Sequence, residues 1–382
     1  MADQNGGTVL LEAVHNQVKK VQTTSLDLSF NELMDMYEQE ELIVDPEYQR
    51  AFRWSEGKES RFIESLVLGM PIPPIFVIEQ DDGKYELIDG LQRLSSYFHF
   101  RGKLALDAFD RKIVKGDVLK LIDCDIVHEL NGRQHDDLPA AIQIRLKRHF
   151  IRVEVIGKDS DQRLRYHMFK RLNTGGENLS DQEIRNCTVR LLDGGAKFMK
   201  FIIELSAQEN FRTCTDTLTD DAKQKRFDQE LVLRFFAFKN NKDAYTHDVG
   251  DFMTDYMEAI ADSAAAAPFD FDYDQQRQAF AKTFQILANT LDEKAFGWVN
   301  KKGTLVRGFA VYHYEAFTLG LQSALDRIDP KNDEHMNRLR QLFEEIKANA
   351  DFIGITTGGG RNSKGALDGR VRFVETRIPQ NL

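Results

Sequence analysis

The sequence has 382 residues, 42% of them hydrophobic, which is enough for two domains of ordinary size, each with its own core. Its formal net charge of −10 gives no overall electrostatic attraction for a nucleic acid, so any such contact must be local. No apolar run approaches the roughly 20 residues of a membrane span, and the first ten residues lack the basic and then apolar order of a secretory signal. We therefore expect a cytoplasmic protein without membrane contact.

The three cysteines are odd in number and far apart, which argues against a disulfide framework and against a paired-cysteine metal site. Three structural thiols are the expected outcome. The histidines do not have the spacing of a zinc finger or a metalloprotease helix, so no zinc is expected.

The first 160 residues alternate helix and strand signals. Ser29 and Glu32 form a capping-box pattern that predicts a helix over 31–40. Further helices are predicted over 56–69, where Pro71, Pro73 and Pro74 are expected to end the helix, and over 138–150. Strands are predicted over 41–45, 75–80, 84–89 and 151–156, the last of them buried. Two hairpins follow from turn chemistry, one around Asp81-Asp82-Gly83 and one over 125–136 with Asn131-Gly132 at its tip.

From about residue 161 the signals become predominantly helical. One helix is predicted over 161–173, and Ser180 with Glu183 predicts another helix start. The Phe-rich runs 230–238 and 308–322 are typical of buried bundle helices, and the glycine-rich segment after residue 354 precedes a strand or a helix. The expected division is an extension over 1–25, an α+β domain over 26–160 and a helical domain over 161–382.

The junction of the strand over 84–89 with a helical pattern that starts at Leu91 is the main candidate site. The first N–H groups of a helix lack internal partners and carry partial positive charge, so such a junction favours an anion. Gly90 removes a side chain that would block a phosphate, Arg93 could bind a pair of phosphate oxygens, and Gln92 could bind a base, a sugar or water. Asp89 could hold a divalent metal ion, or it could simply cap the helix.

The motif IDGLQRL over 88–94 resembles the DGQQR signature of the GmrSD-type restriction endonuclease N-terminal domain family, whose core is related to the ParB and sulfiredoxin fold. The segments VDPEYQRAFRW, GMPIPPIFV, FKRLNTGGENLSDQEIRN and DQELVLRFFAF agree with this family in the same order. Leu91 stands where the signature has its first Gln. If that Gln contacts nucleotide in the family, this chain lacks the contact.

The resemblance implies an NTP-binding and NTP-hydrolysing module, with ATP or GTP and Mg²⁺, in bacterial defence against modified or foreign DNA. The catalytic candidates are Asp89, Gln92 and Arg93, with Asp89 also the candidate metal ligand. The nucleotide-binding candidates are Gly90 together with Tyr48, Gln49, Arg50, Arg53, Trp54, Arg171, Asn173 and Thr174. Two alternatives remain open: Tyr48 and Trp54 would only anchor their loop to the core, and Gly175 with Gly176 would only end a helix.

A local basic patch lies between residues 145 and 171, a segment that contains nine Lys or Arg and three Asp or Glu. Arg145, Lys147 and Arg148 are its candidate DNA contacts, although such charge runs are also typical of a solvated helix face.

The function expected from these features is a nucleotide-dependent subunit of a restriction or anti-phage system that controls DNA engagement or a nuclease partner. No histidine and asparagine pattern of an HNH nuclease follows residue 240, so a separate HNH-type nuclease chain is a possible partner, as is a second copy of this chain. The alternatives are a non-catalytic DNA-binding regulator of the same fold and a metal-dependent nuclease that acts by itself.

Overall fold

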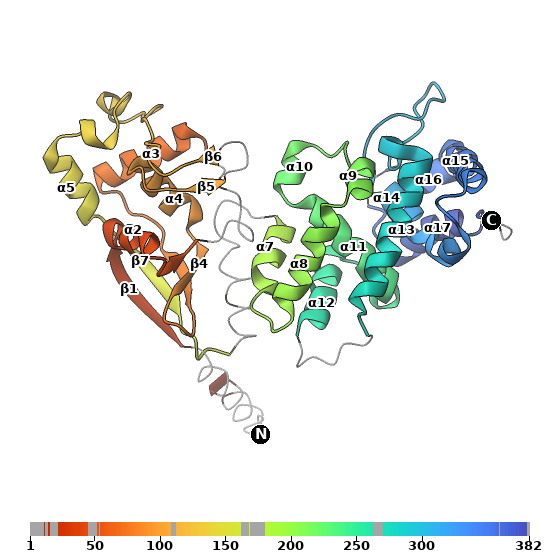
Figure 1. Ribbon diagram of the computed structural model, residues 1–382, viewed down its shortest axis with the longest axis horizontal. Helices are drawn as coiled ribbons and strands as arrows, with labels where there is room; N and C mark the ends of the chain where they lie inside the picture. The colour runs from red at the N-terminus through yellow and green to blue at the C-terminus, as the bar shows by residue number, and fades with distance from the viewer. Residues whose placement is uncertain are drawn as a thin grey trace, which may run out of the picture. The chain divides into compact units, whose positions relative to one another are not determined.

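The structure is a computed structural model with two compact units (Figure 1). The N-terminal unit comprises Met1–Leu179 with Asn186–Leu191, and the helical unit comprises Ser180–Arg185 with Leu192–Leu382. The described residues are 11, 14, 15, 22–44, 52, 54–107, 112–161, 168, 180–262, 270–358 and 360–379. In this part of the chain no helix is both long and apolar enough to cross a membrane.

A mixed five-stranded sheet forms the centre of the N-terminal unit. Its strands are β1 (Thr23–Ser29), β2 (Leu42–Ile43), β3 (Ile75–Glu79), β4 (Tyr85–Asp89) and β7 (Phe150–Ile156), in the order β1-β7-β3-β4-β2. β3 and β4 are the predicted antiparallel hairpin, while β7 with β3 and β2 with β4 are parallel pairs. The α+β class predicted for this region is confirmed.

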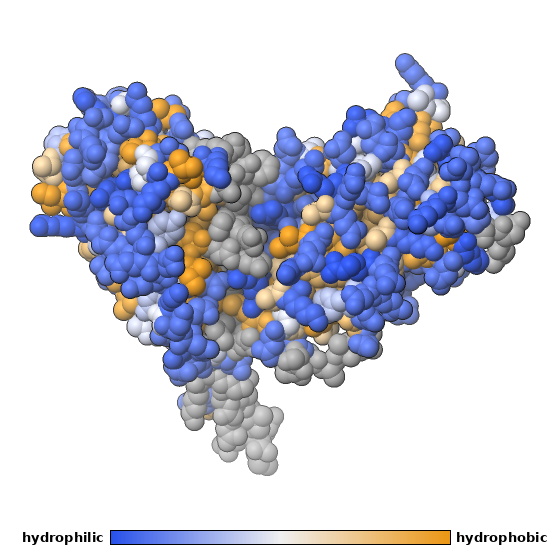
Figure 2. Space-filling model, in the orientation of Figure 1, coloured by the Kyte–Doolittle hydropathy of each residue, from blue (hydrophilic) through white to orange (hydrophobic). Residues whose placement is uncertain are grey.

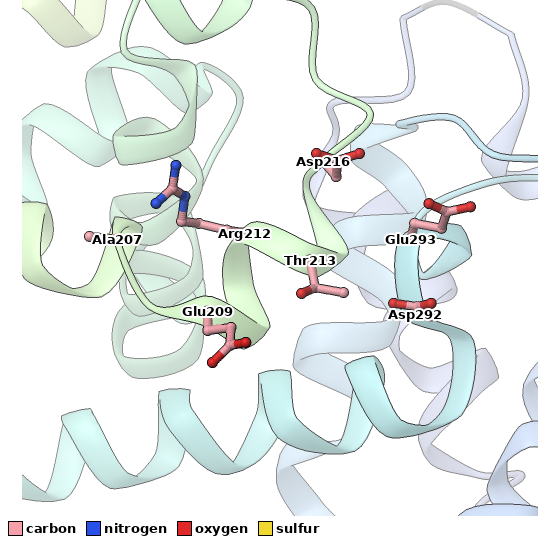
Figure 3. Close-up of a pocket in the computed structure, with 7 residues that line it drawn as sticks. All are labelled: Ala207, Glu209, Arg212, Thr213, Asp216, Asp292 and Glu293. Carbon is pink, nitrogen blue, oxygen red and sulfur yellow. The ribbon is translucent and has the colours of Figure 1, made fainter.

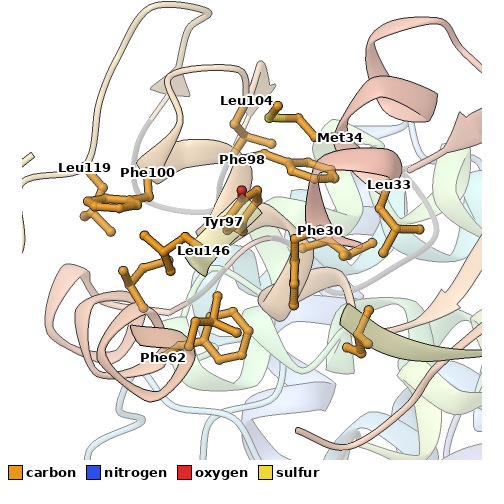
Figure 4. Close-up of a cluster of buried hydrophobic side chains, with 14 of the residues drawn as sticks. Phe30, Leu33, Met34, Phe62, Tyr97, Phe98, Phe100, Leu104, Leu119 and Leu146 are labelled. Carbon is orange, nitrogen blue, oxygen red and sulfur yellow. The ribbon is translucent and has the colours of Figure 1, made fainter. Parts of the chain in front are cut away.

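Helices cover one face of this sheet and enclose the core. They are α2 (Phe30–Glu38), α3 (Glu56–Leu68), α4 (Leu91–Phe100) and α5 (Ala140–Arg148). Phe30, Phe62, Tyr97 and Phe98 from three of these helices converge in Figure 4, where the rings of Phe30 and Tyr97 lie 5.0 Å apart. A small second sheet pairs β5 (Leu106–Asp107) with β6 (Lys112–Ile113). The packing fixes the end of β4 against the start of α4.

Several local predictions are confirmed. The Ser29 hydroxyl accepts a hydrogen bond from the Glu32 N–H at 3.0 Å, as expected of the N-cap of α2. Ser180 and Glu183 form a reciprocal capping box at the start of α7 (Asp181–Val189), with distances of 2.9 and 3.2 Å. The predicted helix over 161–173 lies outside the described residues except Met168.

Three predictions for the N-terminal unit are wrong in detail. Residues 125–136 form no strand hairpin but two 3₁₀ turns, η1 (His128–Leu130) and η2 (His135–Asp137). Gly69, in the left-handed region at φ 73°, ends α3 before the three prolines are reached. Strand β7 is buried on one face only, because Ile151 and Val153 face the core while Arg152 between them is exposed.

The helical unit is a bundle with an aromatic core. It comprises the first part of α7, up to Arg185, and α8 (Gly195–Ser206), α9 (Glu209–Cys214), α10 (Asp220–Gln224), α11 (Phe227–Asn241), α12 (Val249–Ala261), α13 (Tyr273–Leu291), α14 (Val311–Gly320), α15 (Asp333–Ala348), α16 (Ala350–Thr356) and α17 (Lys364–Glu375), with 3₁₀ turns η3 (Lys242–Ala244), η4 (Asp292–Lys294) and η5 (Gln322–Arg327). The rings of Phe280 and Phe284 lie 4.4 Å apart, and Phe235 packs against Phe280 at 5.5 Å. The two predicted Phe-rich helices are confirmed as α11 and α14.

A row of alternating charges connects four of these helices. Arg185 of α7 pairs with Glu230 of α11 at 3.3 Å, and Arg234 of α11 pairs with Glu230 at 3.2 Å and with Glu315 of α14 at 2.7 Å. Arg370 of α17 completes the row on Glu315 at 2.6 Å. The start of α7 is thus bound to the helical unit through the buried Arg185. Removing one partner of such a pair would destabilise the unit, because the other charge would stay buried without compensation.

Two of the three cysteines are described, and both are free and buried, as expected of structural thiols. Burial, with Glu64 and Asp125 nearby, raises the pKa of the Cys124 thiol to about 11. Burial also raises the pKa of Cys214. Both thiols therefore stay protonated and unreactive at neutral pH.

A buried lysine and histidine fix the segment before α14. The Lys347 ammonium nitrogen donates to the carbonyls of Ala295 and Gly297 at 2.9 and 2.7 Å, and His313 Nδ1 lies 2.8 Å from the Gly297 carbonyl. Burial lowers the pKa of Lys347 well below its usual value. Burial and the neighbouring Lys347 lower the pKa of His313 to about 3. His313 is therefore neutral in the folded protein across the physiological range.

We expect His313 to make the folded state sensitive to acid. As pH falls from 6.5 toward 3, the unfolded chain binds a proton that the folded chain excludes, so the free energy of unfolding falls by up to about 1.4 kcal/mol per pH unit. His313→Gln, which keeps a donor for the Gly297 carbonyl, should flatten this slope in urea unfolding measured at successive pH values. Equal slopes for the two proteins would contradict the assignment.

Candidate functional site

Gly90 connects β4 to α4 in a conformation that favours glycine. It is the N-cap of α4 with φ 113°, and in the described part of the chain this position has no side-chain cap hydrogen bond. A Cβ atom built on Gly90 would lie 2.3 Å from Cγ2 of Ile75 on β3. The N-cap is Gly90, so the alternative in which Asp89 caps the helix is wrong. The absence of a side chain at Gly90 lets Ile75 pack directly against the backbone of the junction.

Arg93 is bound within the protein on both sides of its guanidinium group. Its Nη2 lies 2.5 Å from Oδ2 of Asp89, and its Nη1 donates to the carbonyls of Pro73 and Pro74 at 2.5 and 2.9 Å. Only 14% of the Arg93 side chain is exposed, against 42% of the Asp89 side chain. The guanidinium group of Arg93, predicted to bind a pair of phosphate oxygens, thus binds the Pro73 and Pro74 carbonyls and one oxygen of Asp89.

Gln92 has a similar connecting role. Its side-chain oxygen accepts a hydrogen bond from the backbone N–H of Trp54 at 3.1 Å. The Trp54 ring packs edge-on against Phe62 at 5.7 Å and borders the core. This geometry fits the alternative in which Trp54 anchors its segment to the core.

Leu91, the position at which the chain departs from the DGQQR signature, faces the interior. Its side chain is only 5% exposed and belongs to the core cluster of the N-terminal unit. In this chain the residue contributes to packing and not to the exposed surface of the junction.

Three separated segments therefore meet at the end of β4: the segment at Trp54, the prolines before β3, and the junction itself. The carbonyls of Pro73 and Pro74 could not be predicted as acceptors, because a main-chain acceptor has no residue-type signal. The other predicted nucleotide-binding residues lie outside the described residues: Tyr48, Gln49, Arg50, Arg53, Arg171, Asn173 and Thr174.

A second ion pair attaches the end of α7 to the same strand. Arg190 Nη1 lies 2.9 Å from Oε1 of Glu86, while Gln80 Nε2 donates to the other oxygen of Glu86 at 2.8 Å. Both partners belong to the N-terminal unit. Neither Glu86 nor Arg190 was among the predicted site residues, because isolated charges on a strand and after a helix carry no motif.

Among the residues that the structure describes, Asp89 provides the carboxylate at the end of β4 that could contact a metal ion. Within the described ranges no group of three or more His, Cys, Asp or Glu side chains is placed to hold a metal. The exposed carboxylate of Asp89 fits a magnesium ion that arrives with a nucleotide, because Mg²⁺ is commonly held by one or two carboxylates, waters and the phosphates of the substrate.

The comparison with protein families concerns the region that contains this junction. Residues 30–190 match the family model described as GmrSD restriction endonuclease, N-terminal domain. Over this region the chain is thus similar to a GmrSD-type N-terminal domain. No curated protein and no solved structure gives a significant match to the chain. The match confirms the resemblance drawn from the motifs and indicates a component of a restriction or defence system.

The three residues predicted to contact DNA lie on α5. Lys147 and Arg148 are exposed and have no ion-pair partner among the residues that the structure describes, whereas Arg145 donates to the Leu68 carbonyl at 3.4 Å. Arg152 on the neighbouring strand is paired with Asp27 at 3.1 Å. Within the predicted patch, Lys147 and Arg148 are thus two exposed charges without such a pairing.

Proposed function

We propose that the N-terminal unit of this chain binds and hydrolyses a nucleoside triphosphate at the junction of β4 and α4. Turnover would control the engagement of DNA, or of a nuclease partner, in a restriction system. The observation that supports this most is the half-exposed carboxylate of Asp89, which one hydrogen bond fixes directly before a helix N-terminus. A fixed carboxylate beside the positively polarised N-terminus of a helix can bind a metal-carrying phosphate chain.

In this proposal Asp89 is the catalytic residue and Arg93 is a positioning residue. The free oxygen of Asp89 orients the nucleophilic water or the ion that accompanies the phosphates. When bound, Mg²⁺ neutralises developing charge on the phosphate oxygens. Arg93 holds Asp89 Oδ2 and the Pro73-Pro74 carbonyls, so phosphate neutralisation passes to other arginines of the family pattern, Arg50 and Arg53.

The remaining family positions complete the nucleotide-binding surface. Tyr48 and Gln49 with the two arginines would bind from one segment, and Arg171, Asn173 and Thr174 from another. ATP and GTP are the candidate nucleotides. The candidate macromolecular partners are DNA, a separate HNH-type nuclease chain and a second copy of this chain.

DNA binding through α5 has a direct test. Lys147→Glu with Arg148→Glu is expected to weaken binding of duplex DNA at least 10-fold and to reduce its salt dependence, because two phosphate contacts would be lost and two repulsions gained. Binding is measured by fluorescence anisotropy over a range of salt concentrations. An affinity and a salt slope equal to those of the wild type would remove α5 from the DNA interface.

The proposed activity is tested by phosphate release from ATP, GTP, CTP and UTP with magnesium, with and without duplex DNA. The expected result is turnover of at least one nucleotide, changed by DNA. Nucleotide binding without any turnover would favour the non-catalytic regulator, and nicking of a plasmid by the chain alone would favour the nuclease. Failure to bind any of the four nucleotides would contradict the proposal.

A further inference from the structure

A hairpin projects from the helical unit between α13 and α14 (Figure 1). Val299 pairs with Leu305 in an antiparallel bridge, and the Val306 N–H donates to the Trp298 carbonyl at 3.0 Å. The Asn300 side-chain oxygen accepts from the N–H groups of residues 302 and 304 at 2.9 and 3.1 Å, which closes the turn. The tip is thus shaped by its own hydrogen bonds.

The base of the hairpin is held at two places. Lys347 and His313 bind the Gly297 carbonyl from within the bundle, at 2.7 and 2.8 Å. On the surface, Arg307 Nη2 bridges the carboxylates of Asp216 and Glu293 at 3.0 and 2.9 Å. Burying a lysine without a carboxylate partner is costly, so its use here indicates that the position of this segment matters.

Charge is distributed unevenly along the hairpin. Lys301 and Lys302 at the tip are exposed and have no ion-pair partner in the described part of the chain. Near the base lies a pocket of about 420 Å³ whose lining mixes the carboxylates of Glu209, Asp216, Asp292 and Glu293 with Arg212 (Figure 3). Arg307 already pairs with two of these carboxylates, so the concentration of unpaired positive charge lies at the tip, which would attract a polyanion.

Trp298 provides an exposed aromatic surface beside this cationic tip. Its side chain is 44% exposed. A Cβ atom built on Gly308 would lie 2.3 Å from the indole, so the ring rests directly on the glycine backbone. Figure 2 shows that the visible surface of the helical unit is largely hydrophilic, with hydrophobic areas between the polar ones.

We propose that the hairpin over 297–308 binds an unpaired nucleic-acid strand, with Lys301 and Lys302 on its phosphates and Trp298 stacked on a base. Trp298 lies three residues before Lys301, which is in the turn, and even a fully extended backbone of this length spans at most roughly 11 Å, so one short nucleic-acid strand reaches both. Aromatic stacking next to lysines is the usual way in which proteins hold single strands. The inference rests on the proposed DNA engagement and not on nucleotide turnover.

The first test measures anisotropy of a labelled oligo(dT) of about 15 nucleotides with the full chain. Lys301→Glu with Lys302→Glu is expected to weaken binding at least 10-fold. Lys200→Glu with Lys331→Glu changes the net charge equally at two other exposed lysines of the helical unit and should change affinity less than 2-fold. Equal weakening by both pairs, or by neither, would overturn the proposal.

The second test reads Trp298 directly. The chain has two tryptophans, so Trp54→Phe leaves Trp298 as the sole source of tryptophan fluorescence. Oligo(dT) should quench this emission, whereas polyglutamate should not. Binding of both polymers without quenching would overturn the proposal in favour of a surface for an acidic protein. Phosphate release by the Lys301→Glu, Lys302→Glu protein is measured in parallel. Turnover equal to that of the wild type would show that strand binding by the hairpin and nucleotide turnover at the β4–α4 junction stand or fall separately.

Discussion

Replacing Asp89 by Asn is expected to lower nucleotide turnover by a factor of about 10² to 10⁴, the usual contribution of a group that moves or orients a proton. The asparagine oxygen can still accept from Arg93 at the same place, so the junction should keep its geometry. The negative charge is lost, and with it the capacity to orient a polarised water or a phosphate-bound ion. Steady-state phosphate release and thermal unfolding, measured on the same preparation, separate the two effects.

Asp81→Asn is the matched control for this variant. Asp81 lies in the exposed turn between β3 and β4 and undergoes the same chemical change on the same hairpin. It should leave turnover within a factor of 2 of the wild type. Turnover by the Asp89→Asn protein that equals that of this control would exclude Asp89 from the chemistry.

Replacing Gly90 by Ala is expected to destabilise the N-terminal unit by about 2–5 kcal/mol. A left-handed backbone conformation costs an alanine roughly 1–2 kcal/mol, and forcing a methyl group into a packed contact costs about 1–3 kcal/mol more. Both apply here, because φ is 113° and the new Cβ would lie 2.3 Å from Ile75. Urea unfolding monitored by circular dichroism gives the change in the free energy of unfolding.

Gly83→Ala isolates the backbone part of this cost. Gly83 has φ 81°, but no atom lies within 4 Å of its Cβ position, so only the conformational penalty of about 1–2 kcal/mol applies. The Gly90 variant should therefore be the less stable of the two by the cost of the Ile75 contact. An equal decrease in the free energy of unfolding for the two variants would mean that Ile75 moves away from position 90 at little cost.

Local chemistry explains which elements were predictable from the sequence. Ser29 and Ser180 cap helices because each hydroxyl lies beside the N–H group three residues ahead, and Gly83 closes the β3–β4 turn. The prediction of a hairpin at Asn131-Gly132 was wrong because the Asn131 side-chain amide hydrogen-bonds to the backbone of Cys124. Its oxygen accepts from the Cys124 N–H at 2.9 Å, and its nitrogen donates to the Cys124 carbonyl at 3.0 Å. A side chain there replaces the partner strand that the pattern seemed to require.

The candidate site was predictable as a place and not as a set of roles. The strand, glycine and helix order located the junction, and the family match includes it. Arg93 was assigned to phosphate because an arginine at a helix start often binds one. Its actual partners include the Pro73 and Pro74 carbonyls, whose approach depends on the packing of β3 against α4. Long-range backbone positions of this kind leave no trace in residue type.

Burial of charge in the helical unit was equally hidden. Lys347 lies in a helix with many exposed polar positions, and nothing in its neighbours distinguishes it from a surface lysine. Only the packing of α15 against the segment before α14 brings its ammonium group to the Ala295 and Gly297 carbonyls. The anchored hairpin therefore could not be inferred before the fold was known.

The most direct test of the nucleotide site is equilibrium binding of a fluorescent, non-hydrolysable ATP or GTP analogue with and without magnesium, to the wild type and to the Asp89→Asn protein. The account predicts that magnesium tightens binding to the wild type about 10-fold or more, and that the variant loses this gain while it still binds the nucleotide weakly. An equal gain from magnesium in both proteins would contradict the assignment of Asp89. Absence of nucleotide binding by the folded wild type would contradict the site itself.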